Sequence, residues 1–370
     1  MTRRAVNSDG SRMQERPRRR TQHLDLTITE DDMLSRSKVS AALVAALAAI
    51  ALGALPGSAQ APPPGSVVAQ AHTRADASAS ALPAQPDRAA DPQVDAEDVP
   101  TLDGTAVRSY DAFDANQGVA IGKRHFYAVN NRTITKHDRS TGEALLQFAG
   151  VEDGPIEHLD SGVVVNRKLY AAHSNYPEWP MESSIEVFNA RTMRPIDTHS
   201  FGIYRGSLTW LDRHDGAWWA AFANYDKVQE GQTEPYGKTY NTQVVKMDNA
   251  FQVVQSWTIP KAILDKFDLM SNSGGSWGPD GRLYLTGHDL PEAYVMKVPR
   301  AGAELEWIAT VRLPGIEGQG IAWDNARSKS TLWGISRENS KVINYSIPFR
   351  SISDPETLYW EVLGPGEFEQ

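Results

Sequence analysis

The sequence predicts an all-β fold built from a repeated unit, and three observations carry that prediction. A short strand with an aromatic residue at its third position recurs five times, with copies about 40 to 65 residues apart. Each copy follows another strand that opens at or near a glycine, and only residues 261–267 have a helical pattern. Four short strands per unit are typical of a β-propeller, so we expect five blades of four antiparallel strands, with six blades as the alternative. The repeated aromatics, expected in the core, are Tyr127, Tyr170, Trp219, Tyr284 and Trp333.

The first unit shows the expected elements in chain order. Residues 118–121 and 125–131 form its first two strands, and residues 134–148 supply two more around a turn. The segment 107–113 precedes this unit and has the pattern of a fourth strand. We therefore expect it to close the ring by pairing with the last blade, beside residues 358–362.

The turn at Asp138–Gly142 has the pattern Asp-x-x-Thr-Gly. This hairpin resembles the outer hairpins of quinoprotein-type and related secreted bacterial propellers, and the resemblance spans residues 105–363. Gluconolactonases and streptogramin lyases are similar in their blade rhythm. The resemblance implies the propeller fold rather than an activity or a single family.

The first 109 residues contain no Phe, Trp or Tyr, so the globular part is expected to be roughly the last 260 residues. Residues 1–32 are polar and are interpreted either as a misassigned translation start, with Met33 as the true first residue, or as a cytoplasmic leader. Residues 33–61 combine basic residues, an apolar run and Ala59-Gln60-Ala61, which is typical of a secretory signal, with a membrane anchor as the alternative. Residues 62–99 are rich in Ala and Pro and are expected to be a disordered tether to the propeller domain, residues 100–370.

Composition excludes several function classes. The chain has no cysteine, so it has no disulfide framework, thiolate metal site or cysteine nucleophile. Beyond residue 61 it has 28 Lys and Arg against 40 Asp and Glu, a net charge of −12. That charge argues against nucleic acid and anionic membrane surfaces as partners. We expect a secreted or periplasmic monomer with no membrane span after signal cleavage and a small-molecule or carbohydrate ligand.

Propeller geometry brings candidate side chains to one face. The loop that leads into the first strand of each blade and the loop that leaves its second strand share this face, which we call the axial face. Three histidines map to it from equivalent positions, whereas His125 and His214 map to the opposite face. The candidate catalytic residues are His158, His173, His288, Asp160, Asp289 and Arg205.

Three interpretations of these residues stay open. The imidazoles could bind a metal together with Asp160 or Asp289, although no fixed spacing identifies the metal, so metal and cofactor are unknown. One histidine could instead act as general base while Arg205 binds a substrate carboxylate. The histidines could also be hydrogen-bonding ties between blades around a water-filled axis. A glycoside hydrolase would use carboxylates of this face, which are Asp160, Asp289, Glu317 and Glu338.

Aromatic side chains on the loops of the second and third blades suit stacking against sugar rings. The expected substrate-binding residues are Trp179, Tyr225, Asn175, Gln117, Gln319 and Glu338. The sequence therefore predicts a hydrolase or lyase that acts on a carbohydrate or small polar substrate at the axial face. The alternative is a non-catalytic ligand- or protein-binding propeller of the cell envelope. Convergence of titratable groups on one point distinguishes the two, because only the enzyme needs it.

The export signal predicts a cleavage site. Mass spectrometry of the secreted protein should find an N-terminus that begins at or just after Pro62, because a signal peptidase cuts after the small-x-small pattern that ends at Ala61. A mature protein that still carries residues 39–55 would contradict the prediction.

Overall fold

The fold is that of a computed structural model, which describes residues 99–325 and 330–353. The expected leader, the export signal and almost all of the tether lie outside the described residues, as does the segment 358–362. No helix within the described part is long and apolar enough to cross a membrane.

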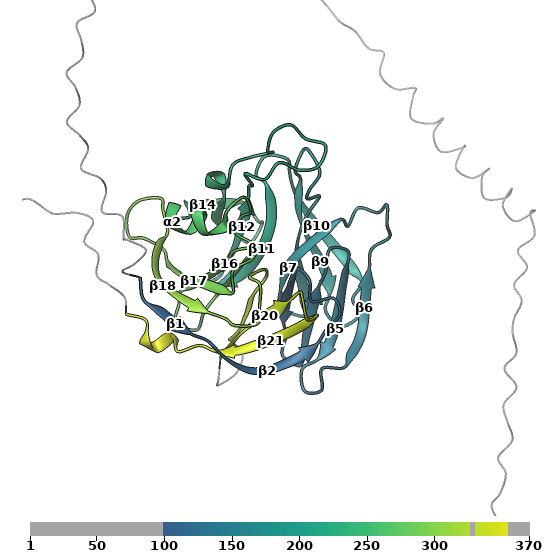
Figure 1. Cartoon of the computed structure of the whole chain (residues 1–370). Helices are drawn as coiled ribbons and strands as arrows, with labels where there is room; N and C mark the ends of the chain where they lie inside the picture. The colour runs from purple at the N-terminus through teal and green to yellow at the C-terminus, as the bar shows by residue number, and fades with distance from the viewer. Residues whose placement is uncertain (1–98, 326–329, 354–370) are drawn as a thin grey trace, which may run out of the picture. The chain divides into compact units, whose positions relative to one another are not determined.

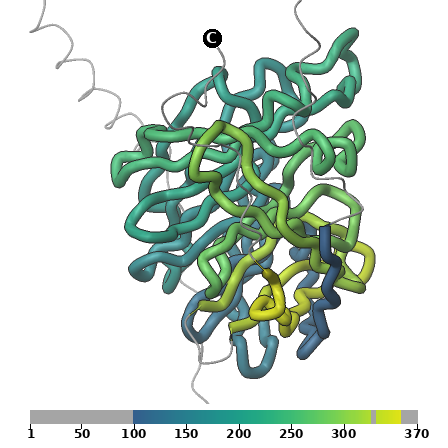
Figure 2. The backbone as a smooth tube through the Cα atoms, turned by 90° about the vertical axis from the view of Figure 1, so that its left-hand side faces the viewer, coloured from purple at the N-terminus to yellow at the C-terminus, as the bar shows by residue number. Residues whose placement is uncertain are grey.

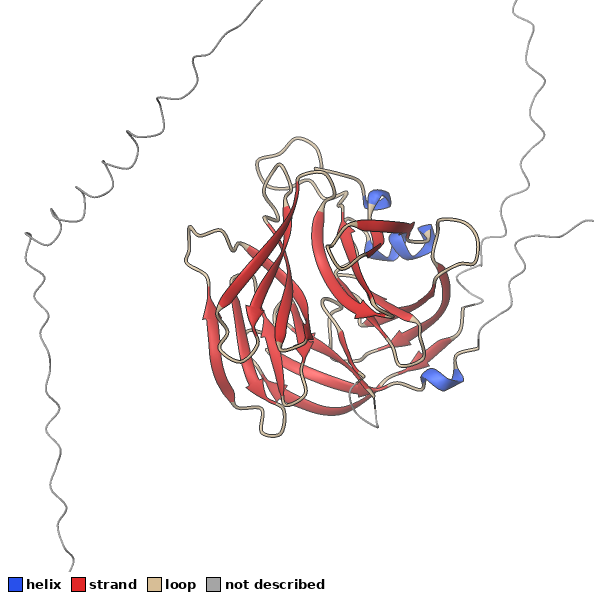
Figure 3. Ribbon diagram, turned by 180° about the vertical axis from the view of Figure 1, so that it is seen from behind, coloured by secondary structure: helices blue, strands red, loops and turns tan. Residues whose placement is uncertain are grey.

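Five blades of four antiparallel strands each make up the described part of the propeller, with very little helix, and one blade carries a fifth strand at its edge (Figure 1, Figure 3). The expected five blades are therefore present. The first blade comprises β3 (Gly118–Ile121), β4 (His125–Val129), β5 (Thr133–Asp138) and β6 (Ala144–Ala149). The second comprises β7 (His158–Val165), β8 (Lys168–Ser174), β9 (Ser183–Asn189) and β10 (Pro195–Gly202). The third comprises β11 (Ser207–His214), β12 (Ala217–Ala223), β13 (Gln243–Met247) and β14 (Val253–Thr258).

The last two blades incorporate N-terminal strands. The fourth blade comprises β15 (Gly274–Trp277), β16 (Leu283–Thr286), β17 (Glu292–Lys297) and β18 (Glu306–Arg312), and β1 (Thr101–Asp103) pairs parallel with β18. The fifth comprises β19 (Ala322–Asp324), β20 (Thr331–Ser336), β21 (Lys341–Ser346) and β2 (Thr105–Asp111). The short helices are η1 (Thr239–Asn241), α2 (Lys261–Leu264), η2 (Asp265–Phe267) and η3 (Phe349–Ser351).

The first strands of the blades contact one another in ring order, β3 to β7, β11, β15, β19 and back to β3. The ring closes because β2 pairs antiparallel with β21 as the outer strand of the fifth blade. The N-terminal and C-terminal parts of the described chain accordingly run side by side (Figure 1, Figure 2). The expected closure by residues 107–113 is confirmed in position, within β2 and the residues that follow it.

Glycines open some first strands because the blades crowd together at the axis. A Cβ atom on Gly118 would lie 2.8 Å from the carbonyl oxygen of Asp160, and one on Gly320 would lie 2.8 Å from the Cα of Gly118. Any larger residue would force the neighbouring strands apart. The glycine pattern that identified the repeat therefore follows from the close approach of the blades at the axis.

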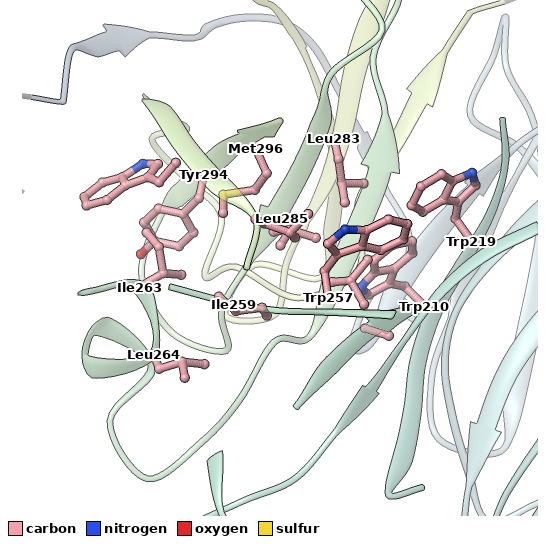
Figure 4. Close-up of a cluster of buried hydrophobic side chains, with 14 of the residues drawn as sticks. Trp210, Trp219, Trp257, Ile259, Ile263, Leu264, Leu283, Leu285, Tyr294 and Met296 are labelled. Carbon is pink, nitrogen blue, oxygen red and sulfur yellow. The ribbon is translucent and has the colours of Figure 1, made fainter. Parts of the chain in front are cut away.

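The core lies between blades, where the second strands place their aromatic side chains. Tyr127, Trp219, Tyr284 and Trp333 are buried, and Tyr170 packs against the cluster between the second and third blades. The largest cluster fills the space between the third and fourth blades and contains Trp210, Trp219 and Trp257 (Figure 4). The prediction that these aromatics belong to the core is confirmed.

Replacement of Trp219 tests the packing between blades. Trp219→Ala should lower the free energy of unfolding by about 3–5 kcal/mol, because it leaves a cavity in the largest cluster. The matched control is Trp179→Ala, which removes a tryptophan that is 43% exposed and should cost about 1 kcal/mol or less. Chemical denaturation measures both. Equal losses in the two variants would contradict the assignment of Trp219 to the space between blades.

Candidate functional site

The loops predicted to share the axial face do so. Each first strand begins opposite the end of the second strand, as in the pairs Gly118 with Val129 and His158 with Ser174. His214 lies at the other end of the third blade, where its ring stacks on Trp277 with the centroids 4.0 Å apart. The register that assigned side chains to the two faces therefore holds.

A guanidinium near the axis joins three blades. Nε of Arg337, which follows β20 in the fifth blade, donates to the carbonyl oxygen of Asn116 (2.6 Å), and Nη2 donates to Oε1 of Gln117 (3.0 Å). Nη1 lies 3.1 Å from Nε2 of His288 in the fourth blade. Burial lowers the pKa of Arg337, while nearby carboxylates, among them that of Asp160, raise it. Arg337 therefore ties the fifth blade to the first and fourth.

His288 has a hydrogen-bond partner at each ring nitrogen. Because a guanidinium only donates, Nε2 must accept from Arg337, and the ring proton therefore resides on Nδ1. Nδ1 donates to Oδ1 of Asp289 over 2.5 Å. Burial lowers the pKa of His288, which favours this neutral ring. In this arrangement His288 has no free lone pair with which to accept a substrate proton.

His173 is also engaged on both sides. Its Nε2 accepts from the backbone N–H of Glu157 (3.1 Å), so its proton resides on Nδ1, which donates to Oγ of Ser184 (2.9 Å). Ser184 in turn donates to Oε1 of Glu186 (2.7 Å). Burial lowers the pKa of His173. Its contacts match the interpretation of this histidine as a structural tie, and we leave it out of the proposed site.

His158 and Asp160 form the remaining pair. A β-bulge interrupts the pairing of β7 with β8 between Leu159 and Gly162, and it includes Asp160. Bulges re-aim side chains, and here Oδ1 of Asp160 comes within 3.5 Å of Nε2 of His158. Oδ2 of Asp160 is buried without a hydrogen-bond partner in the described part of the chain. Nδ1 of His158 has no hydrogen-bond partner there either, so it can accept a proton.

A cavity of about 600 Å³ opens beside His158, between the first and second blades. We call it the axial cavity because it opens on the axial face. This volume lies within the range of small-molecule sites. The ring of Tyr176 lies 5.1 Å from that of His158 and supplies an aromatic surface. The cavity is lined by Gln117, Asn130, Asn131, Arg132, Thr133, Glu157, His158, Tyr176, Pro177 and Glu178.

Arg205 and Tyr225 do not lie where their expected roles in substrate binding would require. The exposed Arg205 lies over the ring of Phe222, 5.5 Å from its centroid, and does not line the cavity. Tyr225 is buried against Tyr176 instead of standing on the rim, and burial raises the pKa of its hydroxyl. The arginine near the axis is therefore Arg337, which our candidate set missed although it leaves a second strand in the same register.

Of the other expected binding residues, some make hydrogen bonds within the protein and others are exposed. Asn175 uses its amide group on the backbone of Pro180 and Glu182, and Gln319 donates to the carbonyl oxygen of His288. Gln117 lines the cavity but also donates to Asn131 over 2.6 Å. The two exposed residues of the set are Trp179 and Glu338.

The three histidines do not form a metal centre with the acids. In residues 99–325 and 330–353, no group of three His, Asp or Glu side chains is arranged to hold a metal ion. The expected alternative of a shared site with Asp160 or Asp289 is wrong for these residues. The physical reason is that His173 and His288 each direct both nitrogens to protein partners.

Solved structures similar to this chain include β-propellers. The PQQ-bound aldose sugar dehydrogenase from Streptomyces coelicolor is 13% identical, with 62% of this chain and 77% of that chain covered and a TM-score of 0.37. The Kuenenia stuttgartiensis hydrazine synthase is 12% identical, covering 61% and 70% with a TM-score of 0.36. The Cps50 (Swd1) β-propeller domain from Myceliophteria thermophila is 11% identical, covering 66% and 99% with a TM-score of 0.35.

With TM-scores of 0.35 to 0.37 these likenesses carry no argument about this chain. No protein-family model matches the chain, and no curated protein sequence matches it.

The buried, neutral His173 predicts a pH-dependent stability. Because burial lowers its pKa from 6.5, the unfolded chain binds a proton more readily, and stability falls as the pH drops below about 6.5. His173→Gln should be less stable than the wild type near pH 8 but should lose less stability between about pH 7 and pH 5. Denaturant unfolding across this range measures the difference. The same pH dependence in both proteins would show that folding does not perturb His173.

Proposed function

We propose that the cavity between the first and second blades binds a small, hydroxylated ligand of the carbohydrate class. The observation that carries the proposal is the mixture of groups around His158: amides, a hydroxyl, a guanidinium, two carboxylates and the ring of Tyr176. A sugar hydroxyl both donates and accepts, so it suits such a mixed lining, and a sugar ring can stack on an aromatic face. Among the described residues, the side-chain amide nitrogens of Asn130 and Asn131 have no protein acceptor and are available to the ligand.

A second candidate function is hydrolysis or elimination at the same place. The observation that favours it is the 3.5 Å approach of Asp160 to Nε2 of His158, because a carboxylate beside Nε2 favours the tautomer protonated there. That tautomer leaves the lone pair on Nδ1, where His158 would accept a substrate proton as general base. Asp160 would then hold the ring and stabilise the imidazolium.

We also propose that the protein works outside the cytoplasm as a monomer. Support comes from the apolar run 39–55 and the small-x-small pattern that ends at Ala61. An acidic propeller with a long Ala- and Pro-rich segment before it suits a tethered module in the envelope or the medium.

Substitutions around the cavity distinguish binding from catalysis. Calorimetry against neutral mono- and disaccharides should identify a ligand, and Asn131→Ala should raise its Kd by about three- to tenfold through the loss of a hydrogen bond. His125→Ala, a half-buried histidine on the opposite face, is the matched control and should leave the Kd unchanged.

Under the catalytic candidate, His158→Gln should reduce turnover about 10²- to 10⁴-fold while changing the Kd only slightly. A sugar that binds wild type and Asn131→Ala equally would contradict the proposed site. Binding without turnover in the wild type would support the non-catalytic function.

A further inference from the structure

A second cavity, of about 420 Å³, opens on the opposite face between the third and fourth blades. It lies between the β11–β12 and β15–β16 hairpins, beside β13, β14 and the loop after β17. Its lining belongs to none of the groups discussed above for the axial face. The cleft is lined by His214, Asp215, Trp219, Lys246, Gln255, Trp257, Trp277, Gly281, Val298, Pro299, Arg300 and Gly302.

Three tryptophans form one wall of this cleft. Trp219 and Trp257 stack with their ring centroids 5.4 Å apart, and Trp277 meets Trp219 edge-on at 4.7 Å. Figure 4 shows Trp219 and Trp257 within the same cluster. The indoles pack against the core with 5–7% of their surface exposed, and the His214 ring stacks on Trp277, so the wall is rigid and a ligand ring would meet it at the exposed indole edges and at the imidazole.

Lys246 is a cation held within this aromatic wall. It pairs across the sheet with Trp219 on one side and Gln255 on the other, and its ammonium lies 5.6 Å from the Trp219 ring centroid. The equivalent residue of the first blade is Lys136, which pairs with Tyr127 and donates to the carbonyl oxygen of Arg191. Lys246 makes no hydrogen bond or ion pair within the described part of the chain, so its donors are available.

The rest of the lining adds donors without matching acceptors. Arg300 also lacks an acidic partner among residues 99–325 and 330–353. Nε1 of Trp219 and Nε1 of Trp277 are buried with no acceptor in the same residues. The one carboxylate of the lining, Asp215, is 3.3 Å from Nε2 of His214 and largely exposed. A ligand that brings acceptors and negative charge would complement this cleft.

We propose that this cleft binds a carboxylate carried on a ring. The ring would lie against the tryptophan wall, and the carboxylate would meet Lys246 and Arg300. Acidic sugars and aromatic acids share this chemistry. The site is distinct from the axial cavity and does not depend on what that cavity binds.

Matched ligand pairs test the proposal. Purified protein is titrated with D-glucuronate against D-glucose, and with benzoate against benzamide, by calorimetry and tryptophan fluorescence. Each pair differs chiefly in its carboxylate. At least one carboxylate should bind at least about tenfold more tightly than its neutral partner, and which one does so tells an acidic sugar from an aromatic acid.

Variants locate the binding. Lys246→Gln should raise the Kd of the carboxylate about tenfold or more, whereas Lys136→Gln, at the equivalent position of the first blade, should not change it. Arg300→Gln, in an exposed loop, gives an independent test if Lys246→Gln fails to fold. Asn131→Ala should also leave this binding unchanged, because it alters only the axial cavity.

The proposal is overturned by any of three results. Neither carboxylate binds at about 10 mM, or the neutral partners bind as tightly, or the Kd is unaffected by the cleft substitutions. A Kd that rises in Asn131→Ala and not in Arg300→Gln would assign the carboxylate to the axial cavity and would also overturn it.

Discussion

The pairing of β2 with β21 is the contact on which the rest of the propeller depends. It joins residues 105–111 to residues 341–346 and so spans nearly the whole described chain. Closing a loop of that length costs chain entropy, which the ring must recover from packing between all five blades. A buried ion pair between Arg139 of the first blade and Asp324 of the fifth, with 2.5 Å between Nη2 and Oδ2, spans the same junction. Arg337 can reach Gln117 only because the junction is closed.

Closure also determines where a ligand can lie. At the axis the first strands approach so closely that Gly118 and Gly320 leave no room for a side chain, and Arg337 takes up the space near them with three polar contacts. The two cavities described above open instead between neighbouring blades, one on each face. The bulge that carries Asp160 shows how a regular first strand can still direct a polar group toward such a cavity.

The sequence predicted the blades and the faces because both follow from strand period and register. It could not predict the partners of a side chain, since these lie on other loops and strands of the same blade, as for His173, or on another blade, as for His288. His173 and His288 lie on the expected face, but an N–H from Glu157 and the guanidinium of Arg337 occupy their nitrogens. The bulge at Asp160 has no sequence signature of its own. Tyr225 was expected on the rim, yet it packs inward against Tyr176, a contact between loops of two blades.

The two proposed sites would differ in selectivity because of the charges that line them, even though the chain is acidic overall. At physiological salt, charges more than about 8 Å apart are largely screened, so a ligand responds to the groups that line its own cavity. In the axial lining Glu157 and Glu178 outnumber Arg132, and this balance disfavours an anion and suits neutral hydroxyl groups. Lys246 and Arg300, which line the cleft on the opposite face, favour an anion. The same ring of blades can therefore hold a neutral polar ligand on one face and an acidic ring on the other without competition between them.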